Sequence, residues 1–326
     1  MTPAQLSRTV LHTVRRAVED DELCVAVPER VKVRTPPRSG CGDYATNVAL
    51  LLARGGGDAL GIAEVLRRRL LRTPGIARVE VAAPGFLNIT LDAGSHAELV
   101  QAVRSAGSRY GHGSALAGVS VPLGAADEVR AALVAHVVRG LVHAVGGVVV
   151  PGQGPVVRPV PVSGAELLRS LGADAARWAL LRPAGHDLPD LDPSRLLSQR
   201  EDNPLFRVRY AHARTRALVR NADQLGIAPE PGAYDHPAEA ALLGLLADHP
   251  RTIEAAARHR APDQLARHLV GVADAFFRFH NDCPALPSGP LKPSAVHRSR
   301  LALADATGAV LAGGLHLLGI SAPEHL

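Results

Sequence analysis

The residues of this chain best suited to contact a polyanion are arginines and a tyrosine within a predicted helix. The segment after Asn203 carries five arginines: Arg207, Arg209, Arg214, Arg216 and Arg220. At about 100° per residue, Arg207, Tyr210 and Arg214 fall within one narrow helical face. Guanidinium groups pair with phosphate and a tyrosine ring offers a stacking plane, so this face suits a single-stranded nucleic-acid loop. The alternative is an ordinary solvated basic face with Tyr210 half buried.

A second pair of candidate contacts lies on a predicted strand over residues 86–91. Side chains alternate between the two faces of a strand, so Phe86 and Asn88 share one face and Leu87 points to the other. Phenylalanine can stack on a base and asparagine can read a base edge. The alternative for Phe86 is a place in the hydrophobic core.

The sequence indicates no metal, cofactor or nucleophile. The three cysteines are widely spaced and fit neither a disulfide framework nor a metal site: Cys24, Cys41 and Cys283. The 15 histidines show no ligand spacing. Residues 55–57 are three glycines without the Gly-Lys-Ser/Thr of a phosphate-binding loop, so they predict a plain loop. Asp187, Asp190 and Asp192 are interpreted as a solvated acidic loop that leads to a helix cap at Asp192.

The composition is that of a globular protein with a basic surface. Hydrophobic residues make up 47% of the 326 residues and charged residues 21%, with a formal net charge of +5. Of the 36 basic residues only Lys32 and Lys292 are lysines, which a GC-rich genome also produces. No apolar run reaches the roughly 20 residues of a membrane span. Residues 1–20 are charged throughout and do not resemble a signal peptide, so a cytoplasmic location is expected.

Residues 1–112 predict a small mixed α/β module. Helices are expected over residues 3–20, 43–53, 60–71 and 95–106, and strands over residues 30–34, 77–82 and 86–91. Asp43 is expected to cap the second helix, and Tyr44 and Asn47 receive structural roles in it.

The rest of the chain predicts a short middle segment and a helical domain. In residues 113–162, a strand, a helix and a strand are expected over 119–123, 127–145 and 147–150, before a linker or surface loop rich in proline and glycine at 151–161. Residues 163–326 predict only helices, with an N-cap at Ser163 and a stop at Gly319. Further helices are expected over residues 173–181, 192–225, 237–247, 251–258, 262–281 and 295–318. The predicted architecture is an α-helical bundle.

Two motifs near the N-terminus resemble the arginyl-tRNA synthetase family. Residues 41–49 read C-G-D-Y-A-T-N-V-A and resemble the family's H-G-D-Y-A-T-N-x-A, with Cys41 replacing the histidine. Residues 79–88 read V-E-V-A-A-P-G-F-L-N and resemble V-E-V-A-G-P-G-F-I-N. In the family these motifs belong to an additional N-terminal domain that holds the tRNA corner where the D-loop lies. The resemblance therefore implies that Phe86 and Asn88 contact the tRNA elbow.

Three segments of the helical part resemble the same family. Residues 172–177 resemble the D-A-L-R element that names its anticodon-binding fold. Residues 203–214 read N-P-L-F-R-V-R-Y-A-H-A-R and resemble N-P-x-Y-Y-V-Q-Y-A-H-A-R, and residues 318–326 resemble L-G-I-x-A-P-E-x-M. This resemblance implies that Arg207, Tyr210 and Arg214 lie near the anticodon arm.

The middle segment departs from the family. A class I synthetase needs several βαβ units of roughly 30 residues each, but only residues 113–162 lie between the two domains. At the place of the family's H-V-G-H motif the chain reads Ala125-Ala126-Asp127-Glu128, whose acids would repel phosphate. The family's K-M-S-K motif has its place before Ser163, where residues 153–162 contain no lysine. The sequence therefore predicts that the chain is not an enzyme and does not activate arginine.

Together these features predict an α+β protein related to arginyl-tRNA synthetase. The expected domains are an N-terminal tRNA-elbow-binding-like domain (1–112), a vestigial middle segment (113–162) and an all-α anticodon-binding domain (163–326). The expected partner is tRNA, possibly an arginine isoacceptor. The alternative is a protein-interaction or regulatory module whose tRNA-binding surfaces are relics. Cys41 and Leu326, which replace the family's histidine and methionine, agree with such drift.

Overall fold

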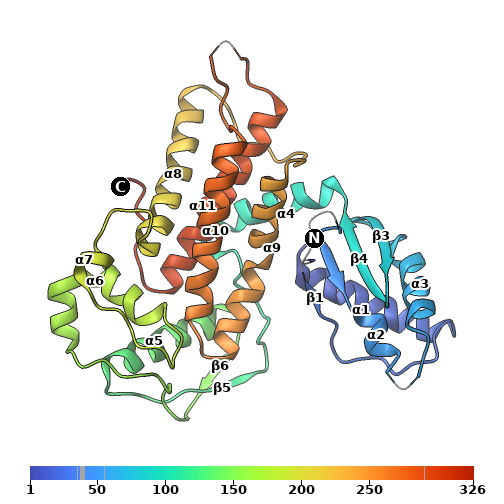
Figure 1. Ribbon diagram of the computed structural model, residues 1–326, viewed down its shortest axis with the longest axis horizontal. Coiled ribbons are helices and arrows are strands. Elements are labelled where there is room, and N and C mark those ends of the chain that lie inside the picture. Colours follow the sequence, from blue (N-terminus) through green and yellow to red (C-terminus); the bar gives the residue numbers. More distant parts are fainter. Residues whose placement is uncertain (35, 37–40, 55, 290) are drawn as a thin grey trace. The chain divides into compact units, whose positions relative to one another are not determined.

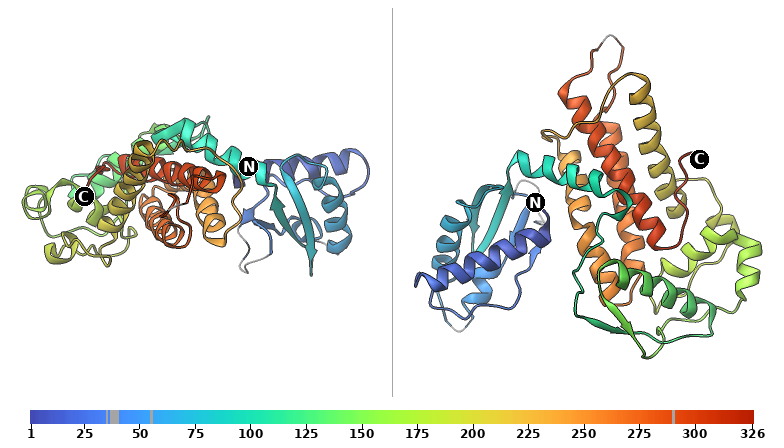
Figure 2. Two further views of the ribbon diagram at one scale, coloured as in Figure 1. Left: turned by 90° about the horizontal axis from the view of Figure 1, so that it is seen from above. Right: turned by 180° about the vertical axis from the view of Figure 1, so that it is seen from behind.

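The computed structural model describes residues 1–34, 36, 41–54, 56–289 and 291–326 (Figures 1 and 2). Gly55, part of the predicted glycine loop, lies outside these residues. The chain forms two compact units. The first comprises Met1–Leu99 with Gly232–Asp235, and the second comprises Val100–Pro231 with His236–Leu326. The predicted middle segment lies within the second unit.

The first unit is built on an antiparallel sheet. Its strands are β1 (Val33–Arg34), β2 (Tyr44–Thr46), β3 (Ile76–Ala82) and β4 (Phe86–Leu91), in the order β1-β2-β4-β3. The helices of this unit are α1 (Pro3–Glu19), α2 (Val48–Leu52) and α3 (Ala59–Leu70), and α4 (Ala93–Ala106) continues from it into the second unit. The predicted β3, β4 and α3 are confirmed to within a residue.

The core of the first unit forms on one face of β4, because buried and more exposed side chains alternate strictly along this strand. Leu87, Ile89 and Leu91 are buried, whereas Phe86 is exposed and Asn88 is half-buried. The buried side chains join apolar residues of α1 and α3 in one cluster, among them Leu6, Val10, Leu66 and Leu70. The sheet therefore buries one face under helices and leaves Phe86 and Asn88 on the other.

The prediction that a helix begins at Asp43 was wrong. Residues 44–46 form β2, and α2 starts only at Val48. Asp43 caps no helix: its Oδ2 accepts a hydrogen bond from the Leu91 amide at 2.7 Å, which ties β2 to β4. Tyr44 packs in the core as expected, but from a strand. Pairing with β4 supplies the backbone partners that a helix would have supplied, so tertiary context overrides local propensity here.

The middle of the chain forms a single βαβ unit. Strands β5 (Ser120–Pro122) and β6 (Val148–Val150) pair in parallel, and α5 (Val129–Ala144) connects them. These are the three elements predicted for this segment. Residues 151–161, predicted as a linker or surface loop, have no regular secondary structure.

The helical part begins with α6 (Gly164–Leu181), capped by Ser163 as predicted. Gly172 breaks its helical geometry with a φ of 72°, so the two predicted helices meet at a kink. The single helix predicted over residues 192–225 was wrong. It consists of α7 (Pro193–Leu196) and α8 (Pro204–Gln224), because Asn203 caps α8 with its Oδ1 while its Nδ2 donates to the carbonyls of Leu196 and Ser198.

The remaining helices pack with α8 into a bundle (Figure 1). They are α9 (Pro237–Arg258), α10 (Asp263–Asp282) and α11 (Ala295–Leu317). A short 3-10 helix, η1 (Gly107–Arg109), follows α4 in the chain. The break predicted at Pro250 was wrong, because α9 continues through it against α5 and α10. Gly319 ends α11 as predicted, with a φ of 72°. The Gly319 amide donates a hydrogen bond to the His316 carbonyl, and the Ile320 amide donates one to the Leu315 carbonyl.

None of the described helices is both long and apolar enough to cross a bilayer. Within the same part of the chain, no group of three or more His, Cys, Asp or Glu is arranged to hold a metal ion.

Candidate nucleic-acid interface

The register of the sheet gathers polar side chains on the open face of the first unit. Arg34 pairs with Ala45, Ala45 with Asn88, and Asn88 with Glu80, so these four residues form one row across the sheet. Cross-strand neighbours project to the same side. The small side chain of Ala45 leaves space between Arg34 and Asn88.

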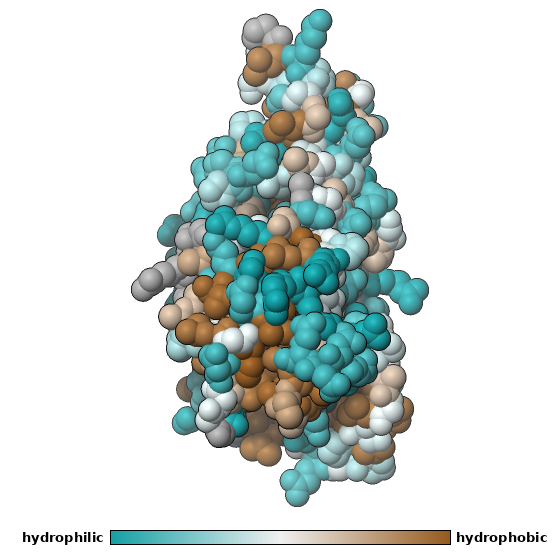
Figure 3. Space-filling view, turned by 90° about the vertical axis from the view of Figure 1, so that its right-hand side faces the viewer, coloured by the Kyte–Doolittle hydropathy of each residue, from teal (hydrophilic) through white to brown (hydrophobic). Residues whose placement is uncertain are grey.

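A cleft of about 480 Å³ lies on this face, here called the sheet-face cleft. Its lining residues come from all four strands and the segments around them: Lys32, Arg34, Pro36, Cys41, Ala45, Thr46, Asn47, Ala82, Phe86 and Asn88. Phe86 is 39% exposed, so the core alternative for this residue was wrong. Figure 3 looks onto the first unit, where hydrophobic residues gather in a patch bordered by hydrophilic ones.

The polar groups of the sheet-face cleft are available to a ligand. Asn47 precedes α2 but makes no capping hydrogen bond with its side chain. Within the described part of the chain, the side chains of Asn47 and Asn88 make no hydrogen bond, and Lys32 and Arg34 make no ion pair. An exposed ring, two free amides and two cations are what an unpaired nucleotide requires: a stacking plane, base-edge partners and phosphate contacts. Asn47, expected to be purely structural, thus joins Phe86 and Asn88.

A second cleft, of about 610 Å³, lies between α8 and α10 and is here called the helix cleft. It brings together all three residues predicted on α8: Arg207, Tyr210 and Arg214. The remaining lining residues come mostly from α10: Glu201, Pro204, Val270, Asp274, Phe277, Arg278, His280 and Asn281.

An aromatic stack forms part of the helix cleft. The ring of Tyr210 lies 5.5 Å from that of Phe206 and 5.7 Å from that of Phe277, with near-parallel planes in the first pair. Tyr210 is nevertheless 40% exposed. Its two aromatic neighbours hold the ring in place, and its exposed surface can accept a stacked base.

The charges of the helix cleft are partly neutralised within the protein. Arg207 forms an ion pair of 2.6 Å with Asp274 and lies over the ring of Phe277. The Nε of Arg214 donates to Nε2 of His280 at 3.1 Å, which requires a neutral imidazole. Burial, and then the charge of Arg214, lower the pKa of His280 in agreement with this bond. Arg214 and Arg278 therefore remain the cations of the cleft without a carboxylate partner among the described residues.

The other arginines of α8 face away from the helix cleft. At about 100° per residue, Arg209, Arg216 and Arg220 form a stripe about 200° around the helix from Arg207. Each is paired inside the second unit: Arg209 with Asp174, Arg216 with Asp305 and Glu324, and Arg220 with Glu324. The arginines of α8 therefore lie on two faces: the predicted face with Arg207 and Arg214 lines the helix cleft, and the other three arginines are paired within the second unit.

Sequence reasoning missed the α10 side of the helix cleft. Phe276 follows the buried stripe of α10, and Phe277 is the next residue, off that stripe and only half-buried. An aromatic residue off the apolar stripe was the available signal. Asp274 gave none, because its role depends on the position of Arg207 across the cleft.

Two family models match the two parts of the chain that carry these clefts. The arginyl-tRNA synthetase N-terminal domain matches residues 5–91, and the DALR anticodon binding domain matches residues 208–326. The chain belongs to the arginyl-tRNA synthetase family. The predicted resemblance is confirmed at this level, and the sheet-face cleft and most of the helix cleft lie in the matched domains.

Individual members of the family are similar over different shares of their length. The arginine–tRNA ligase of Renibacterium salmoninarum is 27% identical over 549 residues, covering 100% of both proteins. That of Clavibacter sepedonicus is 42% identical over 164 residues, which are 49% of this chain and 30% of the relative.

Two solved structures share the fold. Thermus thermophilus arginyl-tRNA synthetase superposes with a TM-score of 0.73 at 15% identity, covering 100% of both chains. Plasmodium falciparum arginyl-tRNA synthetase gives a TM-score of 0.69 at 8% identity, covering 99% of each. At these identities the likeness concerns the fold alone. It is a helix-rich fold of the synthetase type, with the N-terminal and anticodon-binding domains at its two ends.

Proposed function

We propose that this member of the arginyl-tRNA synthetase family binds tRNA without activating arginine. One observation carries the proposal: each of the two matched domains contains a cleft with an exposed aromatic ring beside polar and cationic side chains. Phe86 and Asn88 would contact the tRNA elbow, and Arg207, Tyr210 and Arg214 the anticodon arm. An arginine isoacceptor is the proposed tRNA.

The size of the middle segment supports the lack of activation. A class I nucleotide-binding fold requires several βαβ units, whereas β5, α5 and β6 make only one. The alignment with the R. salmoninarum ligase points the same way: it extends over 549 residues, whereas this chain has 326. A large part of that ligase therefore has no counterpart here. We interpret β5-α5-β6 as the remnant of a catalytic domain.

The start of α5 gives a second line of support. In the family, the helix that follows the H-V-G-H motif binds the ATP phosphates. Here Glu128 caps α5, and its carboxylate accepts hydrogen bonds from the amides of Ala131 at 2.7 Å and Val160 at 3.1 Å. Burial alone would raise the pKa of Glu128, but these backbone bonds lower it, so the group is an anion. A fixed carboxylate at this helix start disfavours a phosphate there.

A binding titration across a salt series tests the proposal. Phe86→Ala and Tyr210→Ala should each weaken tRNA binding by about 1–3 kcal/mol without a change in salt slope, because each removes a stacking plane. Arg214→Gln should lower the salt slope by about one, because it removes one phosphate contact. An isolated anticodon stem-loop should respond to Tyr210→Ala and not to Phe86→Ala, because it lacks the elbow.

Two controls make this experiment decisive. Leu71→Ala removes another exposed apolar side chain of the first unit and should leave affinity unchanged. Duplex RNA of equal length should bind less well than tRNA, because it offers no unpaired bases. Equal affinity for both RNAs, with Phe86→Ala and Tyr210→Ala indistinguishable from the wild type, would make the clefts relics and put a protein-interaction role first.

A further inference from the structure

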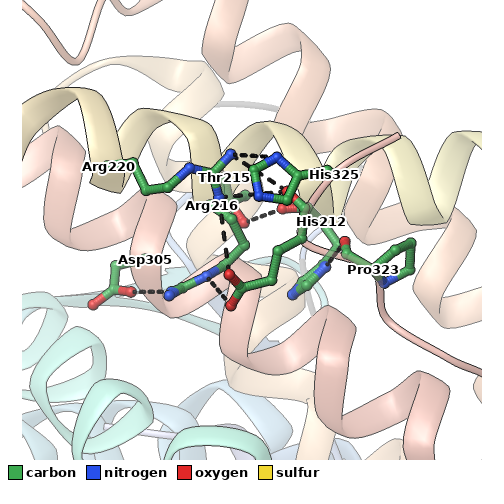
Figure 4. A network of polar contacts seen from close by, with 8 residues as sticks. His212, Thr215, Arg216, Arg220, Asp305, Pro323 and His325 are labelled. Atoms are coloured by element: carbon green, nitrogen blue, oxygen red, sulfur yellow. Dashed lines mark hydrogen bonds and ion pairs between the residues drawn. The ribbon is translucent and has the colours of Figure 1, made fainter.

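The segment that follows α11 lies against α8 and is held there mainly by side chains (Figure 4). Nδ1 of His212 donates a hydrogen bond of 2.9 Å to the Pro323 carbonyl. Asp174 accepts hydrogen bonds from both the amide and the hydroxyl of Ser321. Beyond Ile320, none of the described residues of this segment takes part in a backbone–backbone hydrogen bond. We call residues 321–326 the C-terminal segment.

Glu324 of this segment meets the second arginine stripe of α8. Its Oε1 accepts a hydrogen bond from Nε of Arg216 at 3.3 Å, and its Oε2 lies 4.0 Å from Nη1 of Arg220. Nη1 and Nη2 of Arg220 also donate to the Glu324 carbonyl at 3.4 Å. Within the described chain, Glu324 is the only carboxylate paired with Arg220, whereas Arg216 also reaches Asp305 at 3.6 Å. One anionic group thus sits between two arginines.

These contacts are of a kind that a polyanion can replace. The side chain of Glu324 is 55% exposed and those of Arg216 and Arg220 are 33% and 37% exposed. Ion pairs at such exposure contribute little and are screened by salt. A phosphodiester group, like a carboxylate, presents two anionic oxygens that arginine side chains can bind through charge-assisted hydrogen bonds.

We propose that Arg216 and Arg220 form a further binding site for the RNA backbone, and that Glu324 occupies it in the free protein. RNA phosphate would displace the Glu324 carboxylate and loosen the C-terminal segment from α8. This site is separate from the helix cleft, because its arginines lie on another side of α8. It deepens the proposed RNA-binding function by adding a phosphate site that the protein itself masks.

The test compares full-length variants in binding an oligouridylate, which has neither a tRNA elbow nor an anticodon arm. Glu324→Gln should bind about three- to tenfold more tightly at low salt, with a salt slope steeper by about one, because two arginines lose their competing anion. Glu230→Gln is the matched control. It removes the same charge from the same unit, where Glu230 pairs with Arg298 at 3.2 Å and is 72% exposed.

A double-mutant cycle shows whether the gain passes through the proposed site. Arg220→Gln should change little in the wild type, where Glu324 masks it, and should remove most of the gain in Glu324→Gln. Hydrogen exchange of the Ser321 amide, which donates to Asp174 at 3.2 Å, should also rise when RNA is added to the wild type. Equal affinities of Glu324→Gln and Glu230→Gln would overturn the site, even if the wild type prefers tRNA. Conversely, if the wild type did not prefer tRNA over duplex RNA, the proposed tRNA-binding function would fail, but tighter oligouridylate binding by Glu324→Gln would still support the phosphate site.

Discussion

At the scale of single residues, Arg130 shows how one buried cation fixes the middle segment. It lies on α5, is almost completely buried, and has no carboxylate partner among the described residues. Its guanidinium instead donates to six backbone carbonyls: those of Arg158, Leu180, Pro183, Ala184, Gly185 and Asp187. The planar fork of arginine can serve such a ring of acceptors, whereas the compact head of lysine has too few donors.

Arg130→Met should therefore destabilise the protein strongly. Several buried carbonyls would lose their donor together, and we expect a loss on the order of 3 kcal/mol in the free energy of unfolding. Arg130→Lys should recover only part of it. Urea unfolding measures the effect, and Arg139→Met is the control because Arg139 is exposed on the same helix. Equal midpoints for Arg130→Met and Arg139→Met would show that the carbonyl ring does not need its donor.

At the scale of elements, α8 and α11 pack closely at a glycine. Gly308 of α11 faces Thr215 of α8, and a Cβ on Gly308 would lie 2.5 Å from the Thr215 hydroxyl. That hydroxyl is itself fixed, because it donates to the His212 carbonyl at 2.7 Å. The absence of a side chain at Gly308 therefore sets the spacing of the two helices.

Gly308→Ala should push α8 and α11 apart at a cost of about 1–3 kcal/mol, as overpacked cores do. Gly244→Ala is the matched control, because a Cβ there meets nothing within 4 Å and lies within α9. It should raise stability by about 0.5–1 kcal/mol through helix propensity alone. Thermal unfolding separates the two variants by the sign of their shifts. A stabilised Gly308→Ala would mean that the spacing is not tight.

At the scale of the whole molecule, the proposed loss of catalysis gives a direct prediction. ATP–pyrophosphate exchange with arginine should not exceed the blank without enzyme, with or without tRNA. The physical reason is that adenylate formation needs preorganised groups around a phosphoryl transition state, and the single βαβ unit holds Glu128 at the corresponding helix start. Exchange clearly above the blank would refute the proposed lack of arginine activation. It would not bear on the proposed tRNA binding.

Most of the local structure, and which of the candidate contacts share a face, could be predicted from the sequence. Strand alternation placed Phe86 and Asn88 on one face, and helical periodicity brought Arg207, Tyr210 and Arg214 together. Both inferences needed only near neighbours along the chain. Caps at Ser163 and Asp192 and the stop at Gly319 were likewise readable, because capping is a contact between residues a few positions apart.

Two features depend on the tertiary structure: which backbone groups pair with each other, and which charged side chains keep no partner of opposite charge. Residues 44–46 became a strand because β4 lies beside them, and no local pattern records that neighbour. The same holds for charge: Arg207, Arg216 and Arg220 look alike in the sequence, yet Asp274, Asp305 and Glu324 reach them from distant segments. Among the described residues, Arg214 donates to a neutral histidine and has no carboxylate partner. An electrostatic field depends on distances in space, so the fold decides which arginines can meet a phosphate.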